Sequence, residues 1–256
     1  MKVLSNKWTT RIMLVILITT VLIPGIYAKE KNQEFRVFLH FDDNYAGVYK
    51  YAYPVMKEYG YPGTVFIHTN TIDYPNKNSL DQLKEMKDDG WEFASHSRTH
   101  PDLRKLNMAD LYDEIIGSRN YLIACGLTTK ETSVFGSPHT VWNDYVESLV
   151  EINYETARTD KIIYFGSEEQ PYQRDMVMLK HTSLDQIEYW LQRGRNHNTW
   201  LLFIFHEIGE GGNKYYFHPY KFRKVIELIE KYQPKVSTIH DAIVEWEELN
   251  EEKPTY

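Results

Sequence analysis

Residues 36–43 read RVFLHFDD, an apolar run that stops at two adjacent carboxylates, Asp42 and Asp43. The residues before the two aspartates have the composition of a buried strand. A helical pattern follows over residues 46–59, and residues 63–67 predict the next strand. Because parallel neighbours need a crossover connection, this strand–helix–strand order predicts a parallel sheet.

The same alternation continues along the chain. It predicts further strands at residues 91–95, 132–135, 154–157, 176–179 and 200–205. It predicts further helices at residues 80–89, 108–124, 143–152, 184–193, 219–232 and 241–249. About seven such strand–helix units in one domain are typical of a closed or nearly closed (β/α) barrel, in which the chemistry gathers at the C-terminal ends of the strands.

Residues 1–28 have the pattern of a separate segment. Residues 1–11 carry three positive charges and no acidic residue, residues 12–26 are largely apolar, and Ala28 provides a small-residue exit. This order is typical of a secretory signal peptide, and the apolar run is shorter than the about 20 residues of a membrane span. An uncleaved N-terminal membrane anchor, with residues 12–26 as the tether, is the alternative. Both interpretations predict a secreted or cell-surface protein, with residues 29–256 as a single domain.

The composition excludes several classes of protein. With 42% hydrophobic and 25% charged residues, the chain is neither disordered nor collagen-like. Its one cysteine, Cys125, can form no internal disulfide and no cysteine-rich zinc site. The net charge of -7 argues against a nucleic-acid partner, since such binding depends on cationic groups that neutralise phosphates.

Polar side chains suited to metal binding or acid–base chemistry follow four of the predicted strands. They are Asp42 and Asp43, His96 and His100, His139, and His206. Two adjacent carboxylates at the end of an apolar strand need a positive charge nearby. We expect the two histidines of the H-x-x-x-H pattern to share one side of a helical turn and to hold one metal ion. With one carboxylate they provide three ligands and leave a position open for water, as in catalytic metal sites.

Each of these signals also has a plainer interpretation. An Asp-Asp pair is most often a loop start or a helix cap, and a single H-x-x-x-H pattern is weak in a chain with 10 histidines. The combination, with each motif at a strand end, favours a functional site. The remaining histidines are interpreted as structural or surface residues: His40, His68, His181, His197, His218 and His240. Of these, His40 is expected on the same side of its strand as Asp42, beside the site.

Three motifs together resemble the polysaccharide deacetylase family, the NodB-homology domain of carbohydrate esterase type. They are Phe41-Asp42-Asp43, Ser95-His96-Ser97-x-x-His100 and Phe203-Ile-Phe205-His206-Glu-Ile. The resemblance runs from about residue 37 to residue 244. It implies an α/β fold, namely a distorted, incomplete (β/α) barrel of about seven parallel strands. It also implies metal-dependent removal of N-acetyl groups from N-acetylglucosamine polymers such as peptidoglycan, chitin or surface polysaccharides.

The resemblance assigns a role to each motif residue. Asp42 is implied as the general base and His206 as the general acid. The implied metal ligands are Asp43, His96 and His100. The third family motif implies an oxyanion-binding or substrate-binding position at Pro138 and the backbone N–H of His139. The implied cofactor is a divalent metal, Zn²⁺ first, with Co²⁺, Ni²⁺ and Mn²⁺ as alternatives for such a ligand set.

The chain departs from the family pattern in two places. The third motif usually begins with an arginine that orients the base, but here it reads Gly136-Ser137-Pro138-His139. Arg158, after a predicted strand, is a candidate for that base-orienting cation, and a plain loop salt bridge is the alternative. The second departure is His40, where the family most often has threonine.

Three functions therefore stay open. The first is an exported deacetylase with a polysaccharide or oligosaccharide substrate. The second is a catalytically degenerate polysaccharide-binding protein, which the missing motif arginine favours. The third is a hydrolase of another C–N bond. The aromatic, glycine-rich segment 208–217 is expected to be a lid, a sugar-stacking loop or a flexible surface loop, and Trp142 and Tyr145 are further stacking candidates. The identity of the polymer and the oligomeric state stay open.

Overall fold

The computed structural model describes residues 33–250, so the segment 1–28, interpreted as a signal peptide or anchor, lies outside the described residues. No helix within residues 33–250 combines the length and the hydropathy that crossing a bilayer requires.

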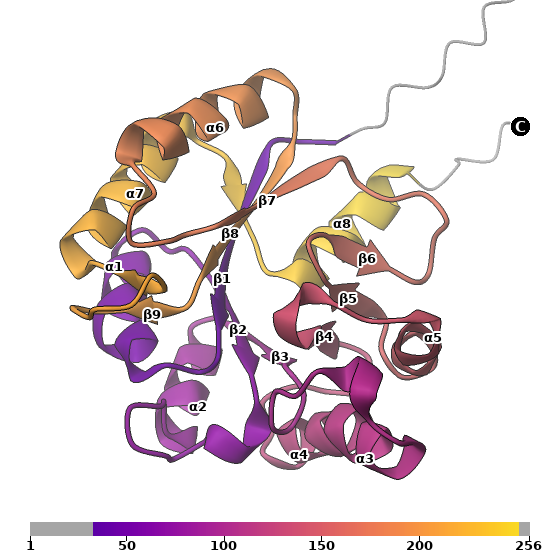
Figure 1. Cartoon of the computed structure of the whole chain (residues 1–256). Coiled ribbons are helices and arrows are strands. Elements are labelled where there is room, and N and C mark those ends of the chain that lie inside the picture. The colour runs from indigo at the N-terminus through magenta and orange to yellow at the C-terminus, as the bar shows by residue number, and fades with distance from the viewer. Residues whose placement is uncertain (1–32, 251–256) are drawn as a thin grey trace, which may run out of the picture. The chain divides into compact units, whose positions relative to one another are not determined.

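A single sheet forms the centre of the fold (Figure 1). Its strands are β1 (Arg36–Asp42), β2 (Thr64–Ile67), β3 (Glu92–Ser95), β4 (Val134–Gly136), β5 (Thr156–Arg158), β6 (Ile162–Tyr164), β7 (Gln173–Val177), β8 (Trp200–Phe205) and β11 (Lys235–Val236). Their order is β6-β5-β4-β3-β2-β1-β8-β7, and β11 pairs with the start of β1. Every pairing is parallel except that of β5 with β6. The predicted α/β class and the predominantly parallel sheet are confirmed.

The barrel closes incompletely between β6 and β7. No strand pairing joins these two edges within residues 33–250. Instead, the Gln173 side-chain amide accepts a hydrogen bond from the Ile162 N–H at 2.8 Å and donates one to the Ile162 carbonyl at 2.7 Å. The Gln173 side chain thus makes, at one point, the hydrogen bonds that strand pairing between β6 and β7 would otherwise make. The predicted incomplete barrel is confirmed.

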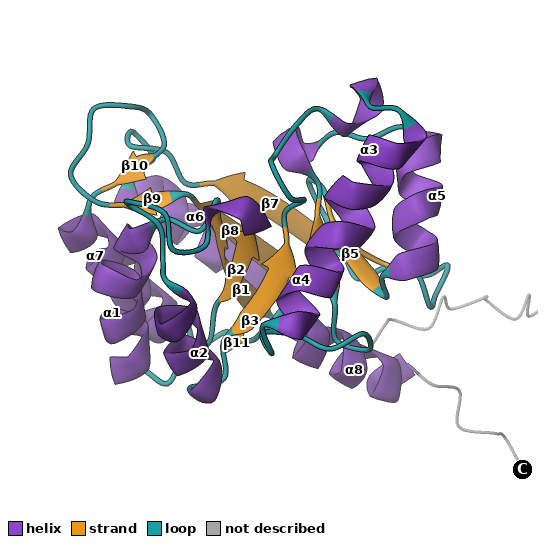
Figure 2. Ribbon diagram, turned by 90° about the horizontal axis from the view of Figure 1, so that it is seen from below, coloured by secondary structure: helices purple, strands orange, loops and turns teal. Residues whose placement is uncertain are grey.

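Helices surround the sheet (Figures 1 and 2). They are α1 (Tyr53–Glu58), α2 (Leu80–Asp88), α3 (Met108–Tyr112), α4 (Ser118–Ala124), α5 (Asp144–Asn153), α6 (Leu184–Asn196), α7 (Pro219–Tyr232) and α8 (Ile239–Asn250). Two short strands, β9 (Glu207–Ile208) and β10 (Tyr216–Phe217), form a separate parallel pair. The structure reproduces the predicted bounds of β8 and α7.

Several elements differ from their predicted form. The helix predicted over residues 108–124 is divided, with a π-helical turn at Asp113–Gly117 between α3 and α4. β7 begins and ends earlier than the strand predicted over residues 176–179. The predicted strands include neither β6 nor β11, which have 3 and 2 residues.

Alternation along the strands divides the core. In β1, Val37, Leu39 and Phe41 pack in one cluster with apolar residues of α7, such as Val225 and Ile229. The residues between them face the barrel interior, since successive strand side chains point to opposite faces. There Phe38 belongs to a second cluster with residues of β2, β3, β8 and α8. The interior series in β1 continues through His40 to Asp42, which directs polar groups toward the C-terminal end of the barrel.

Gly47 allows β9 to lie directly against the turn that follows β1. A Cβ atom at this position would lie 1.9 Å from the Ile208 carbonyl oxygen, so no larger residue fits without moving that backbone. This close approach brings the chain after β8 next to the chain after β1.

Candidate active site

All the predicted site residues except Pro138 line one cavity of about 450 Å³ at the C-terminal ends of the strands. Its lining residues are Asp42, Asp43, Tyr45, His96, His100, Ser137, His139, Thr140, Arg158, Val177, Ile204, His206, Glu207, Asn213, Tyr215 and Tyr216. Each of Asp42, His96 and His206 stands an even number of positions after an interior residue of its strand (Phe38, Ala94 and Trp200). The period of two therefore explains why residues from three strands face one space.

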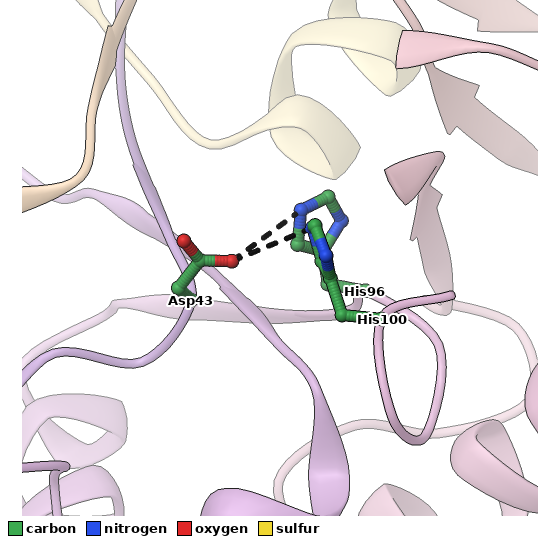
Figure 3. A group of neighbouring side chains, drawn as sticks. All are labelled: Asp43, His96 and His100. Atoms are coloured by element: carbon green, nitrogen blue, oxygen red, sulfur yellow. Dashed lines mark ion pairs between the residues drawn. The ribbon is translucent and has the colours of Figure 1, made fainter. Parts of the chain in front are cut away.

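Asp43, His96 and His100 converge on one point (Figure 3). The Asp43 Oδ1 atom lies 3.9 Å from Nε2 of His96 and 3.6 Å from Nε2 of His100. All three ligand atoms lie within 4.8 Å of one another. One carboxylate and two imidazoles at this spacing fit a divalent ion with a further position open, so the predicted ligand set has the geometry that the chemistry requires.

The segment from His96 to His100 is a loop, so the prediction that the two histidines share a helical turn is wrong. His100 has a φ of 63° and Ser97 a φ of 65°, which no helix contains. The Glu114 carboxylate accepts hydrogen bonds from the backbone N–H groups of Arg98 and Thr99, both at 2.8 Å. Glu114 lies in the π-helical turn between α3 and α4, so a distant helix holds the loop that carries both imidazoles.

The His96 ring is oriented by the third motif. Its Nδ1 lies 2.8 Å from the Gly136 carbonyl oxygen, and a proton on Nδ1 would donate there and leave the Nε2 lone pair facing Asp43. Burial is the largest effect on its pKa and lowers it to about 4, so the ring is neutral and ready to bind a metal at neutral pH. A Cβ on Gly136 would lie 2.3 Å from Cδ1 of Phe66 and 3.1 Å from Nδ1 of His96. Glycine at this position therefore permits the contact.

Asp43 is held by the segment just before α2. Asp43 and Asn44 both have positive φ, 70° and 56°, a conformation that costs energy for residues with a side chain. The Lys77 ammonium donates to the Asp43 carbonyl oxygen at 2.7 Å. The buried Asn44 and Asn78 side chains pair at 3.1 Å, and the Asn78 N–H donates to the Asn44 carbonyl at 3.0 Å. The sequence interpretation missed Lys77 and Asn78, because no local pattern links them to Asp43.

Asp42 is paired with Arg158. The Arg158 guanidinium donates to Oδ1 of Asp42 at 2.7 Å, and the two residues are 1% and 5% exposed. Burial alone would raise the pKa of Asp42 and is the largest single effect, but Arg158, His96 and His206 together lower it to about 2. The carboxylate is therefore ionised at neutral pH. Arg158 occupies the end of β5, so its contact with Asp42 is not a loop salt bridge at the surface.

His206 lies just after β8 and lines the same cavity. Its ring centroid is 4.6 Å from that of Tyr215, which belongs to the segment 208–217. That segment contributes Asn213, Tyr215 and Tyr216 to the lining, whereas Trp142 and Tyr145 do not line this cavity. The loop after His206 thus provides two of the three tyrosines that line the cavity, and Tyr45 after β1 is the third.

The two predicted residues of the third motif have different surroundings. His139 lines the cavity, with its ring centroid 4.5 Å from that of His100 and a φ of 58°. Pro138 is buried and is not among the lining residues. An oxyanion contact at the His139 N–H and a substrate contact at Pro138 both stay predictions.

The sequence interpretation missed His68 as a neighbour of the site. Its Nε2 lies 4.0 Å from Oδ1 of Asp43, and burial is the main cause that lowers its pKa to about 4. His68 directly follows β2, as His96 directly follows β3, so its position at a strand end was an available signal. His40 is fully buried in the interior series below Asp42, edge-on to Phe66 at 5.2 Å between ring centroids.

Comparison with known proteins adds the family. The family model described as polysaccharide deacetylase matches residues 29–157, half of the chain. This chain belongs to the polysaccharide deacetylase family. The matched residues include Asp42, Asp43, His96 and His100, while His206 lies beyond them.

This polysaccharide deacetylase family member is also similar in sequence to curated proteins. A poly-beta-1,6-N-acetyl-D-glucosamine N-deacetylase of Staphylococcus aureus is 36% identical over 94 residues, which are 34% of this chain and 32% of that protein. The matched region thus spans about a third of the length of that curated relative.

Solved structures share the fold of this deacetylase family member along most of its length. The chitin deacetylase of the fungal pathogen Colletotrichum lindemuthianum has a TM-score of 0.59 at 15% identity, covering 83% of this chain and 88% of that one. A family 4 carbohydrate esterase from Bacillus anthracis has a TM-score of 0.57 at 22% identity, covering 83% and 84%. At these identities the likeness concerns the fold, and it extends to the half of the barrel that carries Arg158 and His206.

Proposed function

We propose that this protein hydrolyses the N-acetyl groups of a polysaccharide that contains N-acetylglucosamine. The observation that carries the proposal is the position of the ionised Asp42 next to the three-ligand set of Asp43, His96 and His100, in a cavity at the strand ends. Oδ2 of Asp42 lies 3.9 Å from Nε2 of His96, so the carboxylate borders the ligand set without belonging to it.

The cofactor proposed for this site is a divalent metal, Zn²⁺ first. A divalent metal held by these three side chains would polarise the acetamide carbonyl and lower the pKa of a water molecule bound to it. Asp42 then accepts the proton that the attacking water loses, and Arg158 keeps one of its oxygens fixed while the other faces the reaction.

His206 is proposed as the general acid. An amine is a poor leaving group unless it is protonated, so a proton donor must face the C–N bond that breaks. His206 borders the cavity, and Tyr215 lies against its ring. The backbone N–H of His139 is proposed to donate to the oxyanion, because His139 lines the cavity and a fixed backbone N–H stabilises negative charge that develops in the transition state.

The proposed substrate is a polymer outside the cell. The matched relative from Staphylococcus aureus is named for deacetylation of poly-beta-1,6-N-acetyl-D-glucosamine, which supports a glucosamine polymer. The pattern of residues 1–28 supports export, with the protein secreted or held at the cell surface by residues 12–26.

Arg158 bears on the choice between catalysis and binding alone. The degenerate, binding-only alternative was favoured by the missing arginine of the third motif. Arg158, at the end of β5, pairs with the Asp42 carboxylate as a buried cation. The missing motif arginine therefore no longer favours the binding-only alternative.

Acetate release tests the proposal. The purified protein, loaded with zinc, is assayed on peptidoglycan, chitin oligomers and poly-N-acetylglucosamine, with ammonia measured in parallel. We expect acetate release that falls about 10²- to 10⁴-fold in Asp42→Asn while the bound zinc stays equal to that of the unaltered protein. Zinc-loaded protein that releases no acetate from any of the three would reject deacetylation, and ammonia without acetate would favour cleavage of a different C–N bond.

A further inference from the structure

A second cavity, of about 720 Å³, lies at the other end of the barrel strands. Its lining includes Tyr172, Arg174, Tyr189, Trp190, Arg193 and His197. These residues come from the start of β7, from α6 and from the turn after it, next to the start of β8. Because β8 runs from this end to His206, about 20 Å of extended strand separates the two cavities. We call this second space the arginine–tyrosine cavity.

Two arginine–tyrosine pairs border the arginine–tyrosine cavity. The Arg174 guanidinium lies 5.5 Å from the ring centroid of Tyr172, and that of Arg193 lies 5.9 Å from the ring centroid of Tyr189. Both tyrosines are exposed, at 54% and 52%. Trp190 packs edge-on against Tyr189, with 5.7 Å between ring centroids. Aromatic faces with one wet edge are suited to stacking against flat or ring-shaped ligands.

The two arginines of this cavity are not held in ion pairs. Within residues 33–250, neither Arg174 nor Arg193 forms an ion pair with a carboxylate. Of the other exposed arginine side chains, Arg98, Arg104 and Arg223 each pair with an acidic side chain, whereas Arg195, near the end of α6, has no ion pair within residues 33–250. In a chain with a net charge of -7, two unpaired guanidinium groups facing one cavity form a local site of opposite charge.

We propose that the arginine–tyrosine cavity binds an acidic saccharide, a sugar chain that carries carboxylate or phosphate groups. The guanidinium groups would donate paired hydrogen bonds to the acidic groups, a geometry that arginine provides and lysine does not. The tyrosines and Trp190 would pack against the sugar rings between those groups. The site is separate from the proposed deacetylation, and its ligand differs from a neutral N-acetylglucosamine chain.

Binding is tested by calorimetry on the full chain with four probes. They are a galacturonate hexamer, a phosphorylated maltohexaose, a neutral chitin hexamer and inorganic phosphate alone. We expect at least one of the two acidic hexamers to bind the unaltered protein. Its affinity should be about tenfold or more lower in Arg174→Gln/Arg193→Gln and in Tyr172→Ala/Tyr189→Ala. We expect this affinity to fall as salt is raised, because the contacts are charged and near solvent.

The matched control is Arg104→Gln/Arg223→Gln, which removes the same charge from exposed sites elsewhere and should leave the affinity unchanged. Deacetylation of chitin oligomers should be equal in all these variants, which separates this proposal from the proposed function. If neither acidic hexamer binds, or if inorganic phosphate alone binds as tightly as they do, the proposal is wrong. It is equally wrong if the protein binds phosphatidylglycerol vesicles through these residues and neither acidic hexamer.

Discussion

Arg158 and Asp42 form a hydrogen bond of 2.7 Å although 116 residues separate them in the chain. Arg158 ends β5 and Asp42 ends β1, on opposite sides of β2, β3 and β4 in the sheet order. Both point into the barrel, where the Arg158 guanidinium also lies 4.0 Å from the ring centroid of Phe66. The curvature of the sheet thus brings the two side chains together across the interior.

Replacing Arg158 should weaken the base without removing it. Burial raises the pKa of Asp42, and Arg158 is the main cation that lowers it. The pKa of Asp42 should therefore rise in Arg158→Met. We expect kcat/KM to fall about 10- to 100-fold and the acid side of its pH profile to move to higher pH. Because the loss of one partner of a buried ion pair can destabilise the fold, Arg158→Lys is measured beside it. An Arg158→Lys profile that matches that of Arg158→Met in a folded protein would contradict a positioning role for the charge.

Protonation of Asp42 at acid pH should lower the free energy of unfolding by a measurable amount. Its pKa falls from 3.8 to about 2 on folding, so its contribution is complete above pH 4 and is lost as the pH falls through 2. The shift corresponds to about 2 kcal/mol of unfolding free energy. Urea unfolding of the metal-free protein between pH 5 and pH 2 measures it, and Asp42→Asn should show a flatter slope. Parallel slopes in the two proteins would contradict the assignment.

Zinc should stabilise the metal-free protein. A ligand that binds only the folded state at about 100 times its Kd adds about 2.7 kcal/mol, which for a chain of this size raises the Tm by about 5–10 °C. Thermal unfolding before and after addition of zinc to chelator-treated protein measures this. His100→Gln should abolish the rise, while His181→Gln, at an exposed histidine outside the cavity, should keep it. An equal rise in both variants would place the metal elsewhere.

Gly136→Ala should disturb the His96 ligand. The added Cβ would lie 2.3 Å from Phe66 and 3.1 Å from the His96 ring, so one of them must move. We expect a loss of about 1–3 kcal/mol in unfolding free energy together with weaker zinc binding. Gly212→Ala is the control, because a Cβ there meets nothing within 4 Å. Unchanged zinc affinity in Gly136→Ala would show that the His96 ring does not depend on this contact.

Lys77→Met should loosen Asp43. The substitution removes the donor to the Asp43 carbonyl oxygen and leaves the backbone there in its left-handed conformation. We expect zinc affinity to fall about tenfold, which corresponds to one charged hydrogen bond. Isothermal titration measures it against Lys84→Met, which removes the same charge from the exposed part of α2. Equal affinities in the two variants would exclude this role for Lys77.

The sequence by itself determined which residues stand at the ends of the strands and on which side of them they point. Strand periodicity is local, so β1 with Asp42 and β8 with His206 could be located and oriented from the order of apolar residues alone. The family resemblance, added to the positions of these motifs after strands, identified Asp43, His96 and His100 as the ligand set, and the structure places them around one point.

Only the tertiary structure decided how these side chains are held. Glu114 fixes the loop between His96 and His100, and Lys77 fixes the backbone of Asp43. Arg158 reaches Asp42 from a strand four places away in the sheet. Each partner is distant in the chain, and a hydrogen bond across such a distance leaves no period in the sequence. Such contacts exist only once the barrel curves and brings its strand ends together.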